Sequence, residues 1–205
     1  MVSLTRVVLA SRNAKKIAEL RRILAVAVPQ IEVVGLDEVP PYPDTVEDGA
    51  TFAENAVLKA REAAEISGLP AIADDSGIAV DALNGMPGVL SARWAGRAKD
   101  DEANLRLVLE QVADVPDTRL GAAFVCAAAL VLPSGATHVV EGRMEGSLVR
   151  DPRGTNGFGY DPIFLPSGSV LTSAEMTAAD KDAISHRGKA FRALAEVLAT
   201  TLTTA

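Results

Sequence analysis

Two adjacent carboxylates that follow a short apolar run are the residues of this chain best suited to chemistry. Residues 70–77 read Pro-Ala-Ile-Ala-Asp-Asp-Ser-Gly, so Asp74 and Asp75 come where we expect a buried strand to end. Successive strand residues point to opposite faces, and two like charges this close repel unless a cation or a hydrogen-bond donor lies between them. The pair therefore indicates a divalent-metal or acid/base site, although Asp, Ser and Gly are also common in simple acidic turns.

A second segment has the residue types of a phosphate-binding turn. Residues 11–16 read Ser-Arg-Asn-Ala-Lys-Lys and join a predicted strand to a predicted helix. The N-terminus of a helix presents unpaired N–H groups to anions. Ser11, Asn13 and Lys16 would add a hydroxyl, an amide and an ammonium group to such a site. The same residues also fit an ordinary helix cap with solvent-exposed lysines.

A polar helix face stands between these two segments in the sequence. Glu47 precedes residues 51–60, Thr-Phe-Ala-Glu-Asn-Ala-Val-Leu-Lys-Ala, in which Asn55 and Lys59 are four residues apart. That spacing puts an amide and an ammonium group on adjacent turns of one helix face. By itself such a face is usually a solvent-exposed stripe. Beside the two aspartates, Lys59 would offset carboxylate or phosphate charge.

Two later segments combine aromatic and basic side chains. Residues 157–162 read Gly-Phe-Gly-Tyr-Asp-Pro, in which glycines allow close backbone approach and the ring faces suit a nucleobase. Lys181 and residues 185–188, Ser-His-Arg-Gly, come at the start of the last predicted helix. Arg187 has the fixed donor fork that matches a carbonyl oxygen or a phosphate. Alternatively, the first segment is a tight turn with aromatic core anchors, and His186 is a capping or surface residue.

Hydrophobic periodicity predicts the strands and helices that position these segments. Apolar runs predict strands at residues 7–10, 31–34 and 70–73, with 77–80 continuing beyond an acidic break. Apolar residues at helical spacing predict helices over 17–27, 99–113 and 191–198, and Thr51 is a plausible N-cap for a helix over 52–67 that ends at Gly68. Residues 122–132 and 137–141 predict an antiparallel hairpin. Because the first strands form a β-α-β unit with parallel pairing, the sheet is predicted to be mixed.

Composition limits the class of protein. With 205 residues, of which 48% are apolar, the chain has material for one substantial core, and we expect one domain. The net charge of -7 argues against binding polymeric nucleic acid. We expect a cytoplasmic protein without a membrane segment, because the longest apolar run, 122–132, falls short of the ~18 residues of a span. The single cysteine, Cys126, lies in that run and is expected to fill the core.

Six motifs in this order resemble the inosine triphosphate pyrophosphatase family, whose enzymes hydrolyse nonstandard purine nucleoside triphosphates to the monophosphate and pyrophosphate. The motifs lie at residues 11–16, 51–60, 73–77, 87–93, 157–164 and 185–190, and the resemblance covers nearly the whole chain. It implies an α/β fold with a long mixed β-sheet flanked by helices and two lobes with a central cleft. It also implies a single domain over residues 1–205 and a homodimer.

The resemblance further implies a role for each candidate residue, with Mg²⁺ as the cofactor. Asp75 would be the general base that activates water and, together with Glu47, a magnesium ligand. Lys59 and Asp74 would assist catalysis, and we expect Asp74 to hold Lys59 or a metal-bound water. The residues implied to contact the substrate are Ser11, Asn13, Lys16, Asn55, Ser76, Phe158, Gly159, Tyr160, Asp161, Lys181, His186 and Arg187. Many relatives have Thr-Gly-Asn where this chain has Ser-Arg-Asn, which leaves the role of Arg12 open.

The residue types agree with these implied roles. Hard oxygen ligands without a Cys/His cluster favour Mg²⁺ over Zn²⁺. Arg187 can only donate hydrogen bonds, so it can recognise the 6-oxo acceptor of hypoxanthine or xanthine but not the 6-amino group of adenine. Guanine also carries that oxygen, so rejecting it requires something unfavourable near its 2-amino group, which the sequence does not show. The resemblance implies ITP, dITP and XTP as the substrates, which the enzyme would remove from the nucleotide pool before they enter DNA or RNA.

Other functions fit parts of the pattern. A pyrimidine-directed pyrophosphatase of the Maf-like type is expected to share the general architecture but to lack the Ser-His-Arg segment at 185–187. A nucleotide-sensing protein without turnover would need the same binding residues, and release of pyrophosphate would exclude it. A P-loop kinase is disfavoured, because no Gly-x-x-x-x-Gly-Lys-Ser/Thr occurs in the sequence.

Overall fold

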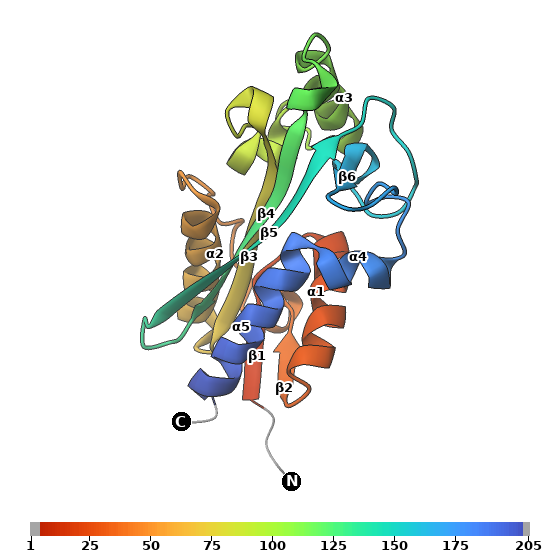
Figure 1. Ribbon diagram of the computed structural model, residues 1–205. Coiled ribbons are helices and arrows are strands. Elements are labelled where there is room, and N and C mark those ends of the chain that lie inside the picture. The colour runs from red at the N-terminus through yellow and green to blue at the C-terminus, as the bar shows by residue number, and fades with distance from the viewer. Residues whose placement is uncertain (1–4, 203–205) are drawn as a thin grey trace. The chain divides into compact units, whose positions relative to one another are not determined.

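A computed structural model describes residues 5–202, and within this range six strands form one sheet in the order β2-β1-β3-β4-β5-β6 (Figure 1). The strands are β1 (Thr5–Leu9), β2 (Ile31–Val34), β3 (Ala71–Val80), β4 (Gly121–Val131), β5 (Thr137–Leu148) and β6 (Phe164–Pro166). The α-helices are α1 (Ala14–Ala27), α2 (Phe52–Ser67), α3 (Asp101–Gln111), α4 (Ala178–Ile184) and α5 (His186–Leu202). Strand β1 pairs in parallel with β2 and β3, whereas β5 pairs antiparallel with β6. The mixed α/β sheet flanked by helices is therefore confirmed.

The chain divides into two compact units that share three strands. Among the described residues, the first unit comprises 5–75, 126–142 and 187–202, and the second comprises 76–125 and 143–186. Strands β3, β4 and β5 each contribute residues to both units, because the boundaries fall after Asp75, Val125 and Gly142.

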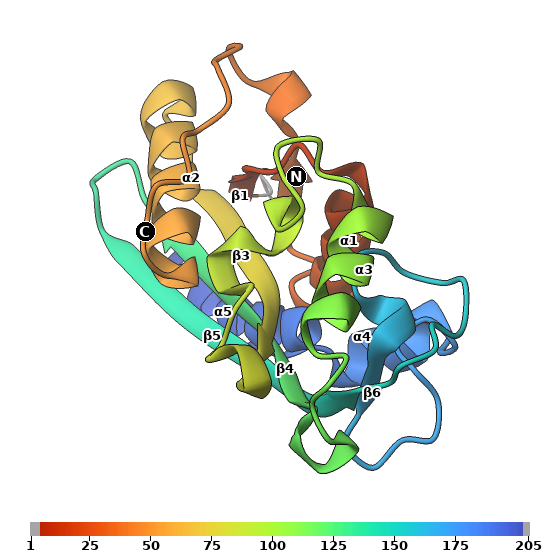
Figure 2. The ribbon, with the colours of Figure 1, turned by 90° about the horizontal axis from the view of Figure 1, so that it is seen from above.

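Alternate strand residues in the first unit pack against helices on opposite faces of the sheet, as the side-chain period of two requires. One face packs against α1 and α5 and buries Val7, Leu9, Ile72, Cys126, Ala128 and Leu130. The other face packs against α2 and buries Val8, Ala10, Ala71, Ala73, Ala127, Ala129 and Val131. Figures 1 and 2 show α2 on one side of these strands and α5 on the other.

Helix α2 begins and ends as its sequence predicts. The Thr51 side chain accepts a hydrogen bond from the Glu54 N–H, at 3.1 Å, and so caps the first turn. Gly68 follows the last turn with a φ of 68°, a left-handed conformation that favours glycine. Both predicted ends of this helix are confirmed.

The second unit has its own apolar core, to which α3 and the neighbouring parts of the shared strands contribute. Its buried residues include Ile78, Val80, Leu105, Val108, Phe124, Tyr160, Ile163 and Phe164. The rings of Phe124 and Phe164 lie 4.6 Å apart between centroids, within the range of favourable aromatic pairs. This core holds Tyr160 and Ile163, and so fixes the turn at residues 157–162 that is a candidate to contact a nucleobase.

Three sequence predictions were wrong in detail. Strand β3 runs without interruption from residue 71 to 80, so Asp74 and Asp75 lie in its middle rather than at its end. A separate helix, α4, precedes the last helix and carries Lys181. Strand β5 extends to Leu148, beyond the predicted end at residue 141. None of the helices described for this chain is long and apolar enough to cross a membrane.

Candidate active site

Strand β3 separates the two adjacent aspartates onto opposite faces of the first unit. Asp75 follows Ala71 and Ala73 on the face that packs against α2, whereas Asp74 follows Ile72 on the face of α1 and α5. Both residues are buried, at 2% exposure for Asp74 and 7% for Asp75. The structure therefore confirms that the two carboxylates have different environments.

The environment of Asp75 is built by α2 and the loop before it. The Asn55 side-chain N–H donates to Asp75 Oδ2 at 3.1 Å, and the Lys59 Nζ lies 3.5 Å from Asp75 Oδ1. The same Lys59 ammonium donates to Glu47 Oε1 at 2.7 Å. The sequence predicted all four residues for the site, and the structure brings them together.

The charges in this cluster determine its proton affinities. Burial raises the pKa of Asp75, and the nearby Lys59 ammonium opposes this effect without cancelling it. Burial alone would lower the pKa of Lys59, but the carboxylates of Asp75, Asp74 and Glu47 outweigh it, and the pKa is raised. Lys59 is therefore a cation at neutral pH, and Asp75 is a stronger base than an ordinary aspartate.

The donor set of this cluster suits magnesium that arrives with a polyphosphate. Glu47 and Asp75 already hold one cation, the Lys59 ammonium, between their carboxylates. Within residues 5–202, no group of three or more His, Cys, Asp or Glu side chains is arranged to hold a metal ion. Mg²⁺ is commonly bound by one or two carboxylates plus substrate phosphates and water, so a pair of acidic ligands fits its chemistry.

On the opposite face, Asp74 lies between two cations. The Lys16 Nζ donates to Asp74 Oδ2 at 3.1 Å, and the Arg187 Nε donates to the same oxygen at 3.3 Å. Arg187 also donates from Nη1 to Glu19 Oε2 at 2.7 Å. We expected Asp74 to hold Lys59 or a metal-bound water, whereas the structure pairs Asp74 with Lys16 and Arg187 and pairs Lys59 with Glu47 and Asp75.

These partners reverse the effect of burial on Asp74. Burial by itself would raise the pKa of this carboxyl, but Lys16 and Arg187 outweigh it and hold the pKa well below the usual range. Burial likewise opposes the charge of Arg187, and Glu19 and Asp74 together raise its pKa. The ionised form of Asp74 is thus stabilised by the fold, in contrast to that of Asp75.

Glu19 is a site residue that the sequence analysis did not identify. Its side chain is buried and lies on α1 one turn after Lys16, among the apolar residues Leu20 and Ile23. A charged residue on the buried side of an amphipathic helix is the signal that marks it, because such a charge needs a partner. That partner, Arg187, is 168 residues away in the sequence.

The turn between β1 and α1 forms the helix start that the sequence predicts. Asn13 is the N-cap of α1, and its side-chain oxygen accepts from the Lys15 and Lys16 N–H groups at 3.0 and 3.2 Å. The Asn13 N–H lies 3.3 Å from the Ser11 Oγ. The cap interpretation is therefore correct for Asn13, while Lys16 extends from the cap to Asp74. An anion at this helix start would meet both the helix dipole and a lysine.

The second unit contains the other candidate segment, which is organised by the buried Asp161. Asp161 Oδ2 accepts from the Phe158 N–H at 2.8 Å and from the Lys181 Nζ at 2.6 Å. Gly157 has a φ of 75°, and a Cβ there would collide with the Asp161 carboxylate, so glycine is required at this position. The Lys181 ammonium also lies 5.5 Å from the centroid of the half-buried Phe158 ring.

The remaining predicted residues of the second unit differ in exposure. Tyr160 is 5% exposed, and its hydroxyl donates to the Ser91 carbonyl at 2.9 Å, so its ring fits the alternative of a core anchor. The Gly159 N–H donates to Asp101 Oδ2 at 3.2 Å.

His186 is buried and stacks on Phe124, with ring centroids 4.8 Å apart and an angle of 11° between the ring planes. Ser76 is half-buried on β3.

Cys126 lies in the core of the first unit, as predicted, and we expect it to be chemically inert in the folded protein. Its thiol is fully buried, and burial raises its pKa well above the ordinary value, so little thiolate forms near neutral pH. Ellman's reagent at pH 8 should therefore label no thiol in the native protein and one thiol per chain after unfolding in urea. Rapid labelling of the native protein would contradict this burial.

Comparisons with known proteins place this chain in a family. The model of the Ham1 family matches residues 7–197. A relative from Streptomyces coelicolor, described as a dITP/XTP pyrophosphatase, is 60% identical over 195 residues, which are 95% of this chain and 98% of the relative. A relative from Nocardia farcinica with the same description is 59% identical and covers 97% of each chain.

Solved structures resemble this chain over nearly its whole length. The crystal structure of a nucleoside-triphosphatase, or dITP/XTP pyrophosphatase, from Mycobacterium abscessus is 57% identical with a TM-score of 0.77, covering 93% of this chain and 98% of that one. The Ham1 protein of Staphylococcus aureus is 40% identical with a TM-score of 0.86, covering 96% and 100%. This chain therefore belongs to the Ham1 family, which confirms the family that its six motifs indicate.

Proposed function

We propose that this protein hydrolyses the nonstandard purine nucleotides dITP, XTP and ITP to the monophosphate and pyrophosphate. It is a hydrolase of nucleoside triphosphates, as its relatives are. The observation that carries the proposal is the buried cluster in which Asp75, Lys59 and Glu47 combine a strengthened base with a cation and a second carboxylate. A base can activate the attacking water, and positive charge stabilises the charge on the transferring phosphoryl group.

Each candidate site residue of the first unit is assigned a role in this reaction. Asp75 takes a proton from the attacking water, the new P–O bond forms as the bond between the α and β phosphates breaks, and pyrophosphate leaves. Asn55 orients the Asp75 carboxylate through its 3.1 Å hydrogen bond. Lys59 offsets phosphate charge, and the N-terminal turn of α1 with Ser11, Asn13 and Lys16 binds the triphosphate. Glu47 and Asp75 would hold Mg²⁺, which supplies charge neutralisation on the polyphosphate when bound.

The second unit is proposed to bind the nucleoside. Phe158 and Gly159 would contact the base or sugar, while Asp161 fixes this turn and Lys181 through the hydrogen bonds described above. Tyr160 anchors the same turn in the core, and His186 is held by its stack on Phe124. We further propose that Arg187 recognises the 6-oxo group, since it can only donate. In the present structure this guanidinium lies against Glu19 and Asp74.

The proposal is tested by measuring pyrophosphate release from a panel of nucleotides with and without Mg²⁺. We expect kcat/KM for ITP and XTP to exceed that for ATP by at least about 10²-fold, because the 6-amino group leaves a buried donor unpaired. Chelation of Mg²⁺ should abolish turnover. Equal rates with pyrimidine triphosphates would indicate the alternative pyrimidine-directed enzyme, and binding without turnover would indicate a nucleotide sensor.

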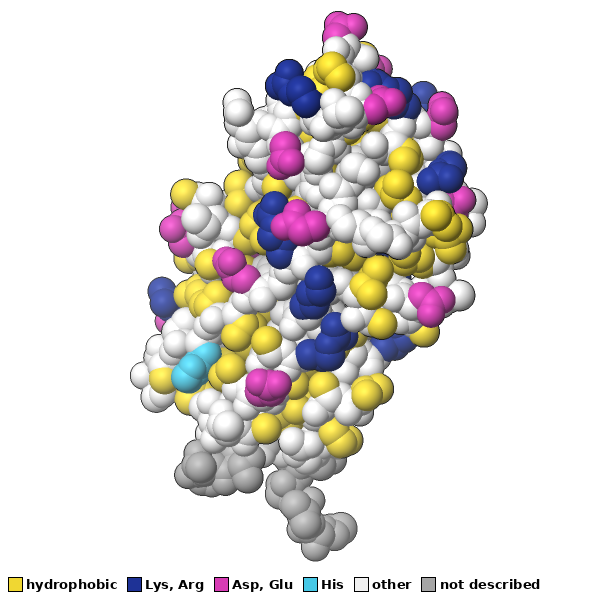
Figure 3. Space-filling model, viewed as in Figure 1, with side chains coloured by type: hydrophobic (Ala, Val, Ile, Leu, Met, Phe, Trp, Pro, Cys, Tyr) yellow, Lys and Arg dark blue, Asp and Glu magenta, His cyan; other side chains and the backbone are white. Residues whose placement is uncertain are grey.

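The assembly and surroundings of the enzyme are also proposed. The two units would act as one pyrophosphatase domain over residues 1–205, because three strands run from one unit into the other. A homodimer in the cytoplasm, where nucleotides are consumed, is carried over from the family resemblance, and sedimentation analysis tests the dimer. On the surface seen in Figure 3, Lys and Arg lie interspersed with Asp and Glu, which suits a small nucleotide better than a polymer.

A further inference from the structure

Arg12 connects the phosphate-binding turn to the loop that carries Glu47. From the turn before α1, its Nη2 donates to the Tyr42 carbonyl at 2.6 Å and lies 3.5 Å from the Pro43 carbonyl. Its Nε lies 2.6 Å from Asp44 Oδ1, and its guanidinium carbon lies 5.1 Å from the centroid of the Tyr42 ring. One side chain therefore contacts three successive residues of this loop.

The loop needs such an external contact because it has no regular structure of its own. Residues 39–50 contain three prolines and form neither helix nor strand. Downstream, the Gly49 and Ala50 N–H groups donate to the Asn55 and Glu54 side chains, so that end is fixed to α2.

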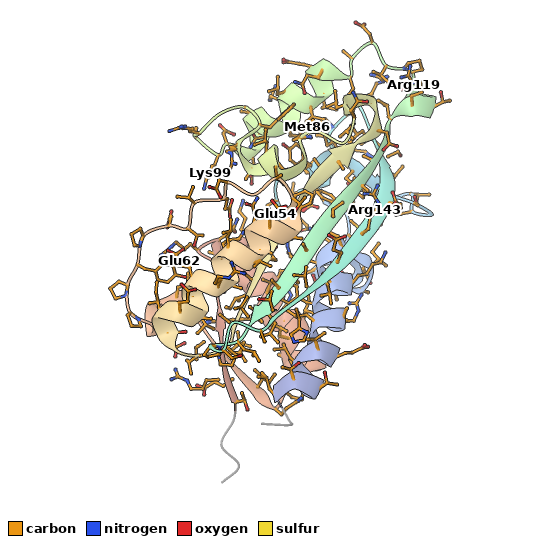
Figure 4. The ribbon with its side chains drawn as sticks, turned by 90° about the vertical axis from the view of Figure 1, so that its left-hand side faces the viewer. Glu54, Glu62, Met86, Lys99, Arg119 and Arg143 are labelled. Carbon is orange, nitrogen blue, oxygen red and sulfur yellow. The ribbon has the colours of Figure 1, made fainter. Side chains whose placement is uncertain are left out.

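The middle of the loop is also tied to α2. Thr45 Oγ1 donates to Glu62 Oε2, and Figure 4 shows Glu62 on the side of α2 along which this loop runs. The contacts of Arg12 join this loop to the turn before α1, and Val39 and Tyr42 also pack against the apolar cluster that contains Ala10. Glu47 follows Asp44 by three residues, so Arg12 holds the chain that leads to it, while its carboxylate pairs with Lys59 of α2.

We propose that Arg12 is a positioning residue that holds the Glu47 loop against the phosphate-binding turn, and so couples magnesium binding to triphosphate binding. This inference rests on the proposed function, in which Glu47 is a magnesium ligand. A guanidinium fork is suited to the task because it can bind a carboxylate and backbone carbonyls at once. Glycine at this position could make none of these contacts.

The direct test compares Arg12→Ala with Asp44→Ala and with the matched control Arg6→Ala. Arg6 is equally exposed, at 44% against 46% for Arg12, and pairs with Glu32 and Glu38 of the same unit. Arg12→Ala and Asp44→Ala should each raise the Mg²⁺ concentration for half-maximal pyrophosphate release from ITP by about five- to tenfold, the scale of a partly exposed supporting contact. For both variants, kcat at saturating Mg²⁺ should stay within about twofold of wild type. Arg6→Ala should match wild type in its Mg²⁺ dependence and in its kcat.

A second readout does not depend on activity. Glutamyl endopeptidase should cleave after Glu47 several times faster in Arg12→Ala and in Asp44→Ala than in wild type or Arg6→Ala, with fragments identified by mass. The Arg12→Ala/Asp44→Ala double variant should behave like Arg12→Ala, because that substitution already removes the contact with Asp44.

Two outcomes would overturn the inference. If Arg12→Ala raises the KM for ITP at saturating Mg²⁺ while Asp44→Ala behaves as wild type, Arg12 contacts the substrate instead of holding the loop. If Arg12→Ala matches Arg6→Ala in both Mg²⁺ dependence and cleavage, Arg12 does not position the loop. A wild-type protein without Mg²⁺-dependent turnover would refute the proposed function, and the cleavage rates would still decide the role of Arg12.

Discussion

Replacing Asp75 with Asn should lower kcat for ITP by about 10²–10⁴-fold, the contribution typical of a positioned general base. Asparagine keeps the shape of the side chain and its contact with Asn55, but it cannot accept the proton of the attacking water. The remaining charges, Lys59 and Glu47, still form their 2.7 Å pair. Binding of the nucleotide through the α1 turn and the second unit should therefore persist.

The measurement separates chemistry from binding and folding. Steady-state pyrophosphate release gives kcat, and isothermal titration with a nonhydrolysable inosine nucleotide gives the dissociation constant, which we expect to change far less than kcat. Asp114→Asn, the same change at an exposed aspartate, is the matched control and should have wild-type kcat. Turnover of Asp75→Asn within a few-fold of wild type would rule out Asp75 as the base.

Local sequence signals predicted the elements that carry the site. The ends of α2 followed from a threonine cap and a terminal glycine, which act within one turn of the helix. The period of two in a strand predicted that Asp74 and Asp75 face opposite sides, and the packing of β3 confirms it. Such predictions succeed because each rests on the geometry of a few consecutive residues.

The prediction that the strand ends at Asp74 and Asp75 was wrong for a physical reason. Two adjacent carboxylates followed by Ser and Gly resemble a turn, since unpaired charge is costly inside a buried strand. In the structure, Lys16 and Arg187 pair with one carboxylate, while Lys59 and Asn55 contact the other. Local propensity cannot foresee this pairing, because the compensating residues come from three helices that lie far apart in the sequence.

Because local sequence does not show contacts between distant residues, Glu19 was missed and the partners of Arg187 and Arg12 were not predicted. Arg187 was identified from its motif and donor chemistry, but its pairing with Glu19 spans 168 residues and has no local signature. The contacts of Arg12 were equally hidden, because they join a turn to an irregular loop 30 residues later. The sequence thus indicated which side chains take part, while their partners emerged only from the tertiary packing.

Asp74→Asn should destabilise the protein by about 3 kcal/mol, although the same change at Asp75 should cost less than about 1 kcal/mol. Lys16 and Arg187 hold the pKa of Asp74 well below its usual range, so the ionised carboxylate stabilises the fold. Removing that charge takes away one of the carboxylates that pair with the buried Arg187, while its pair with Glu19 remains. Burial raises the pKa of Asp75, so the charge there opposes folding, and its neutral isostere removes that cost.

Urea unfolding of both variants, followed by circular dichroism without nucleotide, gives the two free energies of unfolding under identical conditions. The comparison is well matched, because the substitutions are chemically identical, one residue apart on β3, and both buried. Equal stabilities would show that the cations around Asp74 do not favour its ionised form in the folded state. A larger loss for Asp75→Asn would reverse the assignment, making Asp75 the structural carboxylate and leaving Asp74 as the candidate base.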